Sequence, residues 1–414
     1  MRERVLESEQ RVTNLELFFD LVFVFAITQV TGFLADHPTW DGLLRGLFLL
    51  GALWWAWAAY AWLTNTLDPE EGAVRIAVFG SMAAMLVVAL ATPHAFDVDG
   101  VAFAIAYFIV RALHLVLYAI AGRNDPDLEG AVLRILPSAL LGAALLVVAG
   151  FFDGAVRIGI WAVALAIDYL WLLVTGMRGW RVSPEHFVER HGLIIIVALG
   201  ESVIAIGIGA GELPLDAGTI AAAAMGIGVV CALWWSYFDW VIYVSQARLA
   251  DAEGLERAVL ARDLYSYLHL PMVAGIVLFA LGLETTLAHG DIPLEIIPAI
   301  GLCGGLALYL AAHVALRLRT GGGWGHGRPI ASIVLLALVP VATQVPALAA
   351  LALVATVCVA LIAYEALRYP YARAWIRSHR GSFTTDEVRR IAPTRGRRPE
   401  APSPTDPDSG RPTL

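Results

Sequence analysis

One stretch near the N-terminus sets the architecture of this chain: Leu15-Glu-Leu-Phe-Phe-Asp-Leu-Val-Phe-Val-Phe-Ala-Ile-Thr-Gln29. It reads as the start of a membrane-spanning helix, yet it carries two carboxylates, Glu16 and Asp20. Residues four apart lie on one face of a helix, so both acids point the same way. Because an ionised carboxylate in hydrocarbon costs several kcal/mol, we expect that face to meet protein or water rather than lipid.

The composition indicates many such helices. Of 414 residues, 59% are hydrophobic and 15% are charged, whereas a soluble domain carries about 25% charged residues. A span needs about 20 apolar residues, so the long apolar runs predict an all-α transmembrane bundle of about twelve spans. The expected spans centre near Phe25, Leu53, Met85, Phe108, Leu145, Leu165, Leu199, Val229, Val277, Leu306, Leu336 and Val357.

The distribution of arginine predicts the orientation. The sequence has no Lys, and Arg near span ends is favoured on the cytoplasmic side. With twelve spans and both termini inside, the outer segments carry only Arg45 and Arg157. The inner segments carry Arg2, Arg4, Arg11, Arg75, Arg123, Arg134, Arg178, Arg181, Arg190, Arg248, Arg257, Arg262, Arg317, Arg319 and Arg328. This asymmetry predicts that both termini are cytoplasmic.

A faint internal echo predicts two similar halves. Leu53-Trp-Trp-Ala-Trp57 in the second span resembles Leu233-Trp-Trp-Ser-Tyr237 in the eighth. Two six-span halves, 1–178 and 179–371, would share one orientation and be related by an axis along the membrane normal. A chance similarity of Trp-rich runs is the alternative.

Two polar segments lie outside the expected spans. Gln246–Arg262 has one apolar side, so we expect a helix on the cytoplasmic membrane surface. Residues 372–414 read as a disordered, basic and Pro-rich cytoplasmic tail. Its basic part, Arg373–Arg398, is expected either to contact anionic lipid or to serve as a plain topology anchor.

Polar residues inside the spans are the candidate pathway. One face of the fourth span carries Tyr107, Arg111, His114 and Tyr118. An arginine at this depth requires a carboxylate partner. The candidate partners are Asp20, Asp168 in the sixth span and Glu201 in the seventh. The group either lines a central pathway or locks the helices together as a structural ion pair.

Glu201 is the deepest carboxylate. It lies about halfway along its span, where an unpaired acid suits reversible protonation and a proton or cation site. A permanent bond to Arg111 or to neighbouring hydroxyls is the alternative. Gly200, Gly207 and Gly211 form a small-residue stripe that is expected to let another helix approach closely.

Other chemistry has little support in the sequence. Cys231, Cys303 and Cys358 lie in apolar runs as packing residues, and no His pair has metal-ligand spacing on one helix. No nucleotide-binding loop or nucleophile elbow is present. The sequence therefore predicts no cofactor, no metal, no catalytic residues and no nucleic-acid partner, and the chain is not expected to be an enzyme.

Two motifs carry a resemblance to a known family. Val12 to Gln29 resembles the opening motif of the bacterial low temperature requirement A (LtrA) family, and Glu189-Arg-His-Gly-Leu to Leu199-Gly-Glu-Ser202 resembles its second motif. The similarity extends from about Arg11 to Arg368. It implies a polytopic protein of the bacterial cytoplasmic membrane, linked by the family's name to growth at low temperature, and no particular activity. The family-like positions are Glu16, Asp20, Glu189, Arg190, Gly200 and Glu201.

The favoured function is secondary transport of an unknown small solute or ion, coupled to protons or cations. Asp20 and Glu201 would exchange the ion, and Arg111 with His114 would tune or replace their partners. The whole pathway would comprise Glu16, Asp20, Arg111, His114, Asp168 and Glu201. A channel with a carboxylate ring, an intramembrane enzyme acting on lipid, and a static structural or sensory protein remain as alternatives.

Overall fold

The computed structural model describes residues 11–211, 213–379 and 384–387, and these residues fold into helices joined by short connections. The first half of the chain forms α1 (Asn14–Asp36), α2 (Trp40–Thr64), α3 (Gly72–Ala91), α4 (Gly100–Gly122), α5 (Pro126–Ala149), α6 (Gly154–Thr175) and α7 (Pro184–Ala210). The second half forms α8 (Ala217–Ser236), α9 (Ile242–Asp251), α10 (Gly254–Ala261), α11 (His269–Ala288), α12 (Ile296–Ala299), α13 (Gly305–Arg319), α14 (Gly327–Ala342), α15 (Ala347–Arg368) and α16 (Pro370–Ser378).

The all-α, multi-pass prediction is confirmed, with a lower number of full-length spans. Within the described residues, 11 helices are long and apolar enough to cross a membrane. A helix lies at every position where a span was expected, but α14, which contains Leu336, has only 16 residues. At 1.5 Å per residue it is about 24 Å long, shorter than the hydrocarbon core of about 30 Å. Twelve full spans in two halves therefore stay a prediction.

Three long helices change pitch along their length. α8 continues into α9 through π-helical residues Tyr237–Val241, α10 into α11 through Arg262–Tyr267, and α12 into α13 through Ile300–Gly304. Such π-helical turns inside α-helices re-aim side chains and are frequent at functional sites.

The expected surface helix at Gln246–Arg262 is wrong. The chain instead forms two helices of 35 residues, Ala217–Asp251 and Gly254–Ala288, which meet at a tight connection. Most of the apolar side of this segment packs against protein, since Leu249, Ala258 and Ala261 are buried while Leu255 is exposed.

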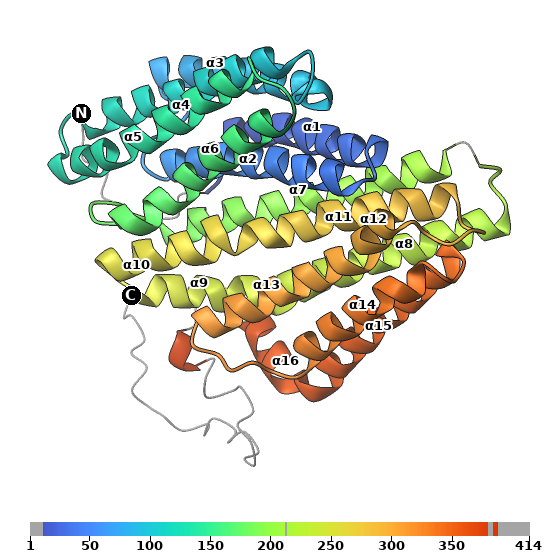
Figure 1. The fold of residues 1–414 in the computed structure, drawn as a ribbon. Helices are drawn as coiled ribbons and strands as arrows, with labels where there is room; N and C mark the ends of the chain where they lie inside the picture. Colours follow the sequence, from blue (N-terminus) through green and yellow to red (C-terminus); the bar gives the residue numbers. More distant parts are fainter. Residues whose placement is uncertain (1–10, 212, 380–383, 388–414) are drawn as a thin grey trace, which may run out of the picture.

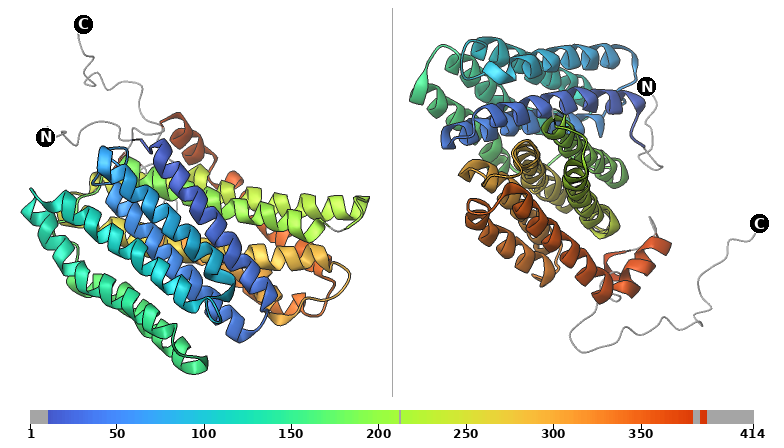
Figure 2. Two further views of the ribbon diagram at one scale, coloured as in Figure 1. Left: turned by 90° about the horizontal axis from the view of Figure 1, so that it is seen from above. Right: turned by 90° about the vertical axis from the view of Figure 1, so that its right-hand side faces the viewer.

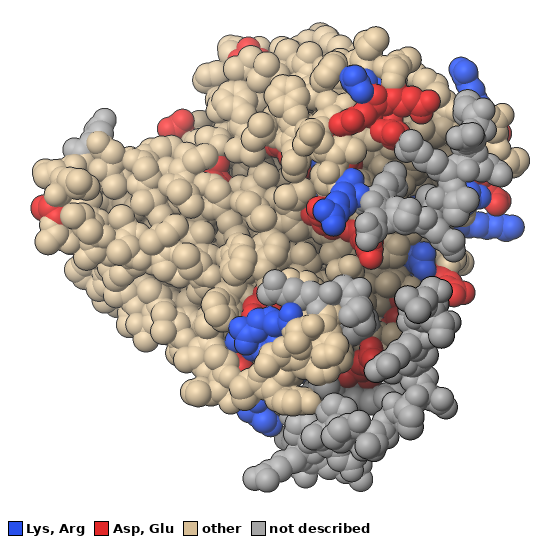
Figure 3. All heavy atoms as spheres, turned by 180° about the vertical axis from the view of Figure 1, so that it is seen from behind, with Lys and Arg blue, Asp and Glu red and all other residues tan. Residues whose placement is uncertain are grey.

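The helices stack in layers (Figure 1). The order runs from α3, α4 and α5, through α1, α2 and α6, to α7 and α11, and then to α8 and α13 beside α14 and α15. The second view of Figure 2 shows the same order from one end of the helices. Charged side chains on the face drawn in Figure 3 gather toward the side of the molecule where α1 and α7 begin, which we call the charged end.

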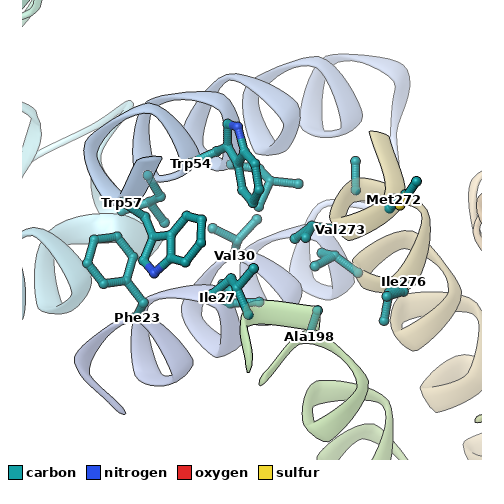
Figure 4. Packing of buried hydrophobic residues seen from close by; sticks show 14 of the residues in the cluster. Phe23, Ile27, Val30, Trp54, Trp57, Ala198, Met272, Val273 and Ile276 are labelled. Atoms are coloured by element: carbon teal, nitrogen blue, oxygen red, sulfur yellow. The ribbon is translucent and has the colours of Figure 1, made fainter. Parts of the chain in front are cut away.

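Apolar side chains fill the centre of the stack. Phe23 and Val30 from α1 meet Trp57 from α2, Ala198 from α7 and Val273 from α11 (Figure 4), and each is buried. The opposite side of α1 is apolar and exposed, with Phe18 and Leu21 among the exposed residues. α1 thus has the inner and outer faces that its sequence predicts, and its apolar exterior faces the bilayer.

The beginning of the expected tail is helical. α16 contains Arg373, which is buried. The rest of the expected tail, except residues 374–379 and 384–387, lies outside the described residues.

Candidate functional site: buried charges in three places

The first site forms where α1 lies along α7. Thr13 and Glu16 form a capping box at the start of α1: the Thr13 hydroxyl accepts from the Glu16 amide, and the Glu16 carboxylate accepts from the Thr13 amide. The same carboxylate then faces α7. Both helices start at the charged end and run in the same direction, because Glu16 meets His186 while Thr28 meets Glu201 further along.

Arg190 on α7 neutralises the pair of acids. Its Nη1 donates to Oδ2 of Asp20 at 3.0 Å and to the carbonyl of Glu16 at 3.0 Å, and its Nε lies 3.7 Å from Oε1 of Glu16. Nε1 of Trp57 donates to the other carboxylate oxygen of Asp20, Oδ1, at 2.9 Å. The Arg190 side chain is fully buried, and its guanidinium carbon lies 5.7 Å from the centre of the Trp57 ring.

The protonation of His186 follows from its neighbours. The Ser183 amide donates to Oδ1 of Asn65 at 2.8 Å, which identifies the amide oxygen of that side chain. The Asn65 amide nitrogen must then donate to Nδ1 of His186, at 3.2 Å. Nε2 therefore carries the proton and donates it to Glu16 at 3.0 Å. We call Glu16, Asp20, Trp57, His186 and Arg190 the Arg190 cluster.

In the Arg190 cluster both carboxylates are fully hydrogen-bonded, whereas Nε and Nη2 of Arg190 have no hydrogen-bond acceptor among the described residues. Each oxygen of both carboxylates accepts at least one hydrogen bond, and all five side chains are buried. Breaking such a buried, hydrogen-bonded pair is costly, because the charge left behind has no water to solvate it. This geometry suits an anchor between α1 and α7 better than a group that exchanges its partner during a transport cycle.

The second site joins Arg111 of α4 to Asp168 of α6. Nη2 of Arg111 donates to Oδ1 of Asp168 across 3.3 Å, a long contact for a charge-assisted bond. Of the three carboxylates expected from the sequence, Asp168 is therefore the partner. Gly142 on α5 makes room for it, since a Cβ there would lie 3.1 Å from the carboxyl carbon.

A cavity of about 60 Å³ opens beside this pair. At 10–15 Å³ per water, it has room for about four to six water molecules. Its lining includes Trp55, Trp62, Arg111, His114, Tyr118, Asp168, Trp180 and Ser266. Although the rings make the walls largely apolar, several polar atoms face the space. We call it the Arg111 cavity.

Several polar atoms of the Arg111 cavity lack a partner. Within the described residues, no hydrogen bond of good geometry reaches Nε of Arg111, either ring nitrogen of His114, the hydroxyl of Tyr118 or Nε1 of Trp180. His114 only approaches the backbone of Ala59, and Tyr118 only approaches Thr66. Buried polar groups are normally paired, so such a cluster indicates that water or a solute supplies the missing partners.

The third site surrounds Glu201 of α7. The Thr28 hydroxyl donates to its Oε2 at 2.6 Å, and the Thr31 hydroxyl lies beside it. No Arg or His forms an ion pair with it among the residues that the structure describes. Glu284 of α11 lies close enough for its charge to interact with those of Glu201 and Asp36. Three carboxylates thus lead from exposed Asp36, through half-buried Glu284, to buried Glu201.

The predicted pathway residues consequently lie in three places rather than around one cavity. Glu16 and Asp20 belong to the Arg190 cluster, Arg111, His114 and Asp168 to the Arg111 cavity, and Glu201 to neither. α2 lies between the first two, with Trp57 facing Asp20 and Trp55 lining the cavity.

Sequence reasoning did not assign roles to His186, Arg190 and Trp57. A signal was present for the first two, because His186 and Arg190 are four residues apart, as Glu16 and Asp20 are. An acidic pair and a basic pair with the same i, i+4 spacing predict that the two helices lie side by side with each acid next to a base. Nothing in the pattern singles out Trp57 among its neighbouring tryptophans.

The predicted glycine stripe does not serve as a helix contact. A Cβ on Gly200 or Gly207 would meet no atom within 4 Å, outside the helix's own backbone, whereas one on Gly209 would lie 2.6 Å from the carbonyl oxygen of Glu284. α11 therefore approaches α7 at Gly209. The stripe fails because those two glycines face away from any neighbouring helix.

Comparison with known proteins gives the family. The model for the bacterial low temperature requirement A protein (LtrA) matches residues 11–363. An uncharacterized protein of Rhizobium meliloti is 31% identical over 73% of this chain and 76% of its own length. No solved structure matches the chain. The match covers both motifs and every described membrane-spanning helix except the end of α15, so the chain belongs to the LtrA family of bacterial multi-pass membrane proteins.

Proposed function

We propose that this protein is a secondary transporter in the bacterial cytoplasmic membrane that couples a small polar solute to protons or cations. The observation that carries the proposal is the environment of Glu201. The other buried acids, Glu16, Asp20, Asp168 and Asp239, each have an arginine within ion-pair distance. Glu201 has hydroxyl partners and other carboxylates instead.

This difference in partners matters for coupling. An adjacent arginine favours the ionised form of a carboxylate, because neutralising the carboxylate would leave the arginine uncompensated. Glu201 has no such constraint, so it can be neutralised by a proton or by a cation that its neighbours also attract. The acids at Glu284 and Asp36 would raise the local concentration of either ion at the entrance.

The Arg111 cavity is the proposed solute site. Its unpartnered atoms are mainly donors, together with the ring of His114, so they fit a small molecule with hydrogen-bond acceptors. The tryptophan and tyrosine rings would pack against its apolar part. Under this proposal, His114 and Asp168 bind a solute and catalyse no reaction, and the protein is not an enzyme.

The proposal revises the roles of the predicted pathway residues. Glu201 carries the coupling ion, and Arg111, His114 and Asp168 hold the solute. Glu16 and Asp20 support the helices through the Arg190 cluster. A static structural or sensory protein is the alternative, and the hydrogen bonds that hold both carboxylates of that cluster favour it.

Glu201→Gln in purified protein tests the proposal, with Glu185→Gln as the matched control. Both changes remove a carboxylate from α7, but Glu185 is exposed in the first turn. In liposomes with an imposed proton gradient, small polar solutes are screened while a trapped dye reports internal pH. We expect solute-dependent proton entry in the wild type and in Glu185→Gln, and its loss in Glu201→Gln.

Infrared titration gives a second readout that needs no solute. A carboxylic-acid carbonyl band should appear and disappear with pH in the wild type and be missing in Glu201→Gln. Wild-type flux in Glu201→Gln, or an unchanged titrating band, would contradict the coupling role. Absence of flux for every solute and ion, in a protein whose Glu201 band does not titrate, would favour the static alternative.

A further inference from the structure

A second cavity lies outside all three sites described above. It has a volume of about 200 Å³ and lies between the end of α13, the glycine-rich connection 320–326, the start of α14 and the ends of α15 and α16. It has room for several water molecules. The charged residues that line it are Arg317, Arg328, Glu365 and Arg373. We call it the α13–α16 cavity.

The arginines in its wall are incompletely neutralised. Arg328 pairs with Glu365 at 2.8 Å, and Arg373 reaches Glu365 at 2.9 Å and Asp239 at 3.0 Å. Arg317 forms no ion pair among the described residues. Glu365 and Asp239 therefore neutralise Arg328 and Arg373, whereas Arg317 adds a guanidinium group with no carboxylate within ion-pair distance among the described residues.

Two buried residues of the cavity wall also carry nitrogens without partners. Arg373 is 4% exposed, and its Nη1 has no hydrogen-bond acceptor. His313 is buried with both ring nitrogens unpartnered. An unpaired donor on a buried guanidinium is costly, so its presence beside a cavity points to an anionic ligand.

The glycine-rich connection shapes the opening. Gly321 and Gly325 have φ values of 84° and 67°, which other residues rarely adopt. A Cβ on Gly325 would lie 2.9 Å from Nη1 of Arg317, and one on Gly322 would lie 2.7 Å from its Cγ. The glycines therefore let the backbone fold closely over Arg317. The first turn of α14, with the positive end of its dipole, follows directly.

We propose that the α13–α16 cavity binds a phosphate-bearing anion, held by Arg317 and Arg373 beside the start of α14. Guanidinium groups and a helix N-terminus next to a glycine-rich turn match the chemistry of a phosphate group. The volume accommodates a phosphate ester rather than a bare ion. The source is either a free phosphate compound or an anionic lipid headgroup, and exposed Trp324 at the rim suits both. This inference does not depend on the transport proposal.

Binding is tested on the purified full-length protein with both sources. Isothermal titration with inorganic phosphate and with glycerol 3-phosphate, against chloride at equal ionic strength, tests the free ligand. Native mass spectrometry after reconstitution with phosphatidylglycerol or with phosphatidylcholine tests the headgroup. Binding in either arm supports the site, and the arm in which it occurs identifies the source.

Arg317→Gln is the decisive variant and Arg377→Gln its control. Arg317 is exposed and unpaired, so its replacement should leave the fold intact, and Arg377 is an exposed arginine on α16 outside the cavity. We expect Arg317→Gln to weaken binding by about tenfold or more, the loss of one charge-assisted bond, and Arg377→Gln to leave it unchanged. Arg373→Gln should weaken it further. Absence of binding in both arms, or wild-type binding in Arg317→Gln, would overturn the site.

Discussion

Arg190 is the residue on which the packing of α1 against α7 most depends. Replacing it by Met in Arg190→Met keeps an unbranched side chain of similar length and removes the charge that faces Glu16 and Asp20. Both carboxylates then stay buried without a cation. Removing one partner of a buried ion pair costs about 3–5 kcal/mol, because the remaining charge is not solvated.

This cost translates into a measurable change in melting temperature. With an unfolding entropy of about 2.1 cal/mol/K per residue, a chain of 414 residues loses about 3–6 °C for such a change. Thermal unfolding of the purified protein in detergent measures it. Arg75→Met is the control, because Arg75 is exposed and, among the described residues, its side chain bonds only the carbonyl of Glu70. We expect this change to shift the melting temperature by less than about 1 °C.

A compensated variant separates charge from shape. Adding Glu16→Gln and Asp20→Asn to Arg190→Met removes both buried charges, and an uncharged core of similar volume is often as stable as an ion pair. We expect this triple variant to recover more than half of the lost melting temperature. If Arg190→Met shifts no further than the control, or if the triple variant is less stable than Arg190→Met, the electrostatic account of the cluster is wrong.

Two further predictions concern packing at other points of the bundle. Gly209→Ala should lower the melting temperature by several degrees, because the added Cβ would lie 2.6 Å from the carbonyl oxygen of Glu284. Gly200→Ala is the control and should be tolerated, because no atom outside its own helix backbone lies within 4 Å of the added Cβ. Equal melting temperatures for the two variants would refute the close approach of α11 at Gly209. Trp57→Phe removes the hydrogen-bond donor to Asp20 and should lower the free energy of unfolding by about 1.5–3 kcal/mol, which is less than the effect of Arg190→Met. Chemical unfolding measures this change, and a larger loss would show that packing of the indole dominates.

Local patterns in the sequence predicted much of the fold. Each apolar run forms a helix, and the length and hydrophobicity that predict it can be read from the run itself. The capping box at Thr13 and Glu16 likewise involves residues only three positions apart. The surface helix at Gln246–Arg262 failed for the opposite reason. Its one apolar side suits lipid and protein equally well, and only neighbouring helices determine which one it meets.

The sequence predicted which types of residue form the candidate site, but only partly which of those residues contact one another. An arginine inside the bundle requires an acid, so Arg111 was expected to meet one of three carboxylates, and Asp168 is the one within reach. The sequence could not separate Glu201 from Asp20, since both are acids inside apolar helices. The structure separates them, because Asp20 meets Arg190 while Glu201 meets Thr28.

By itself, the sequence determined that this chain crosses the membrane many times and carries ionisable groups on the inner faces of its helices. Those properties depend on residues close together in the chain, and the cost of placing charge in hydrocarbon enforces them. Which charges are paired depends on contacts such as Asp20 with Arg190, which are 170 residues apart. Only the tertiary structure decides these contacts, because the register of one helix against another sets which side chains come within bonding distance.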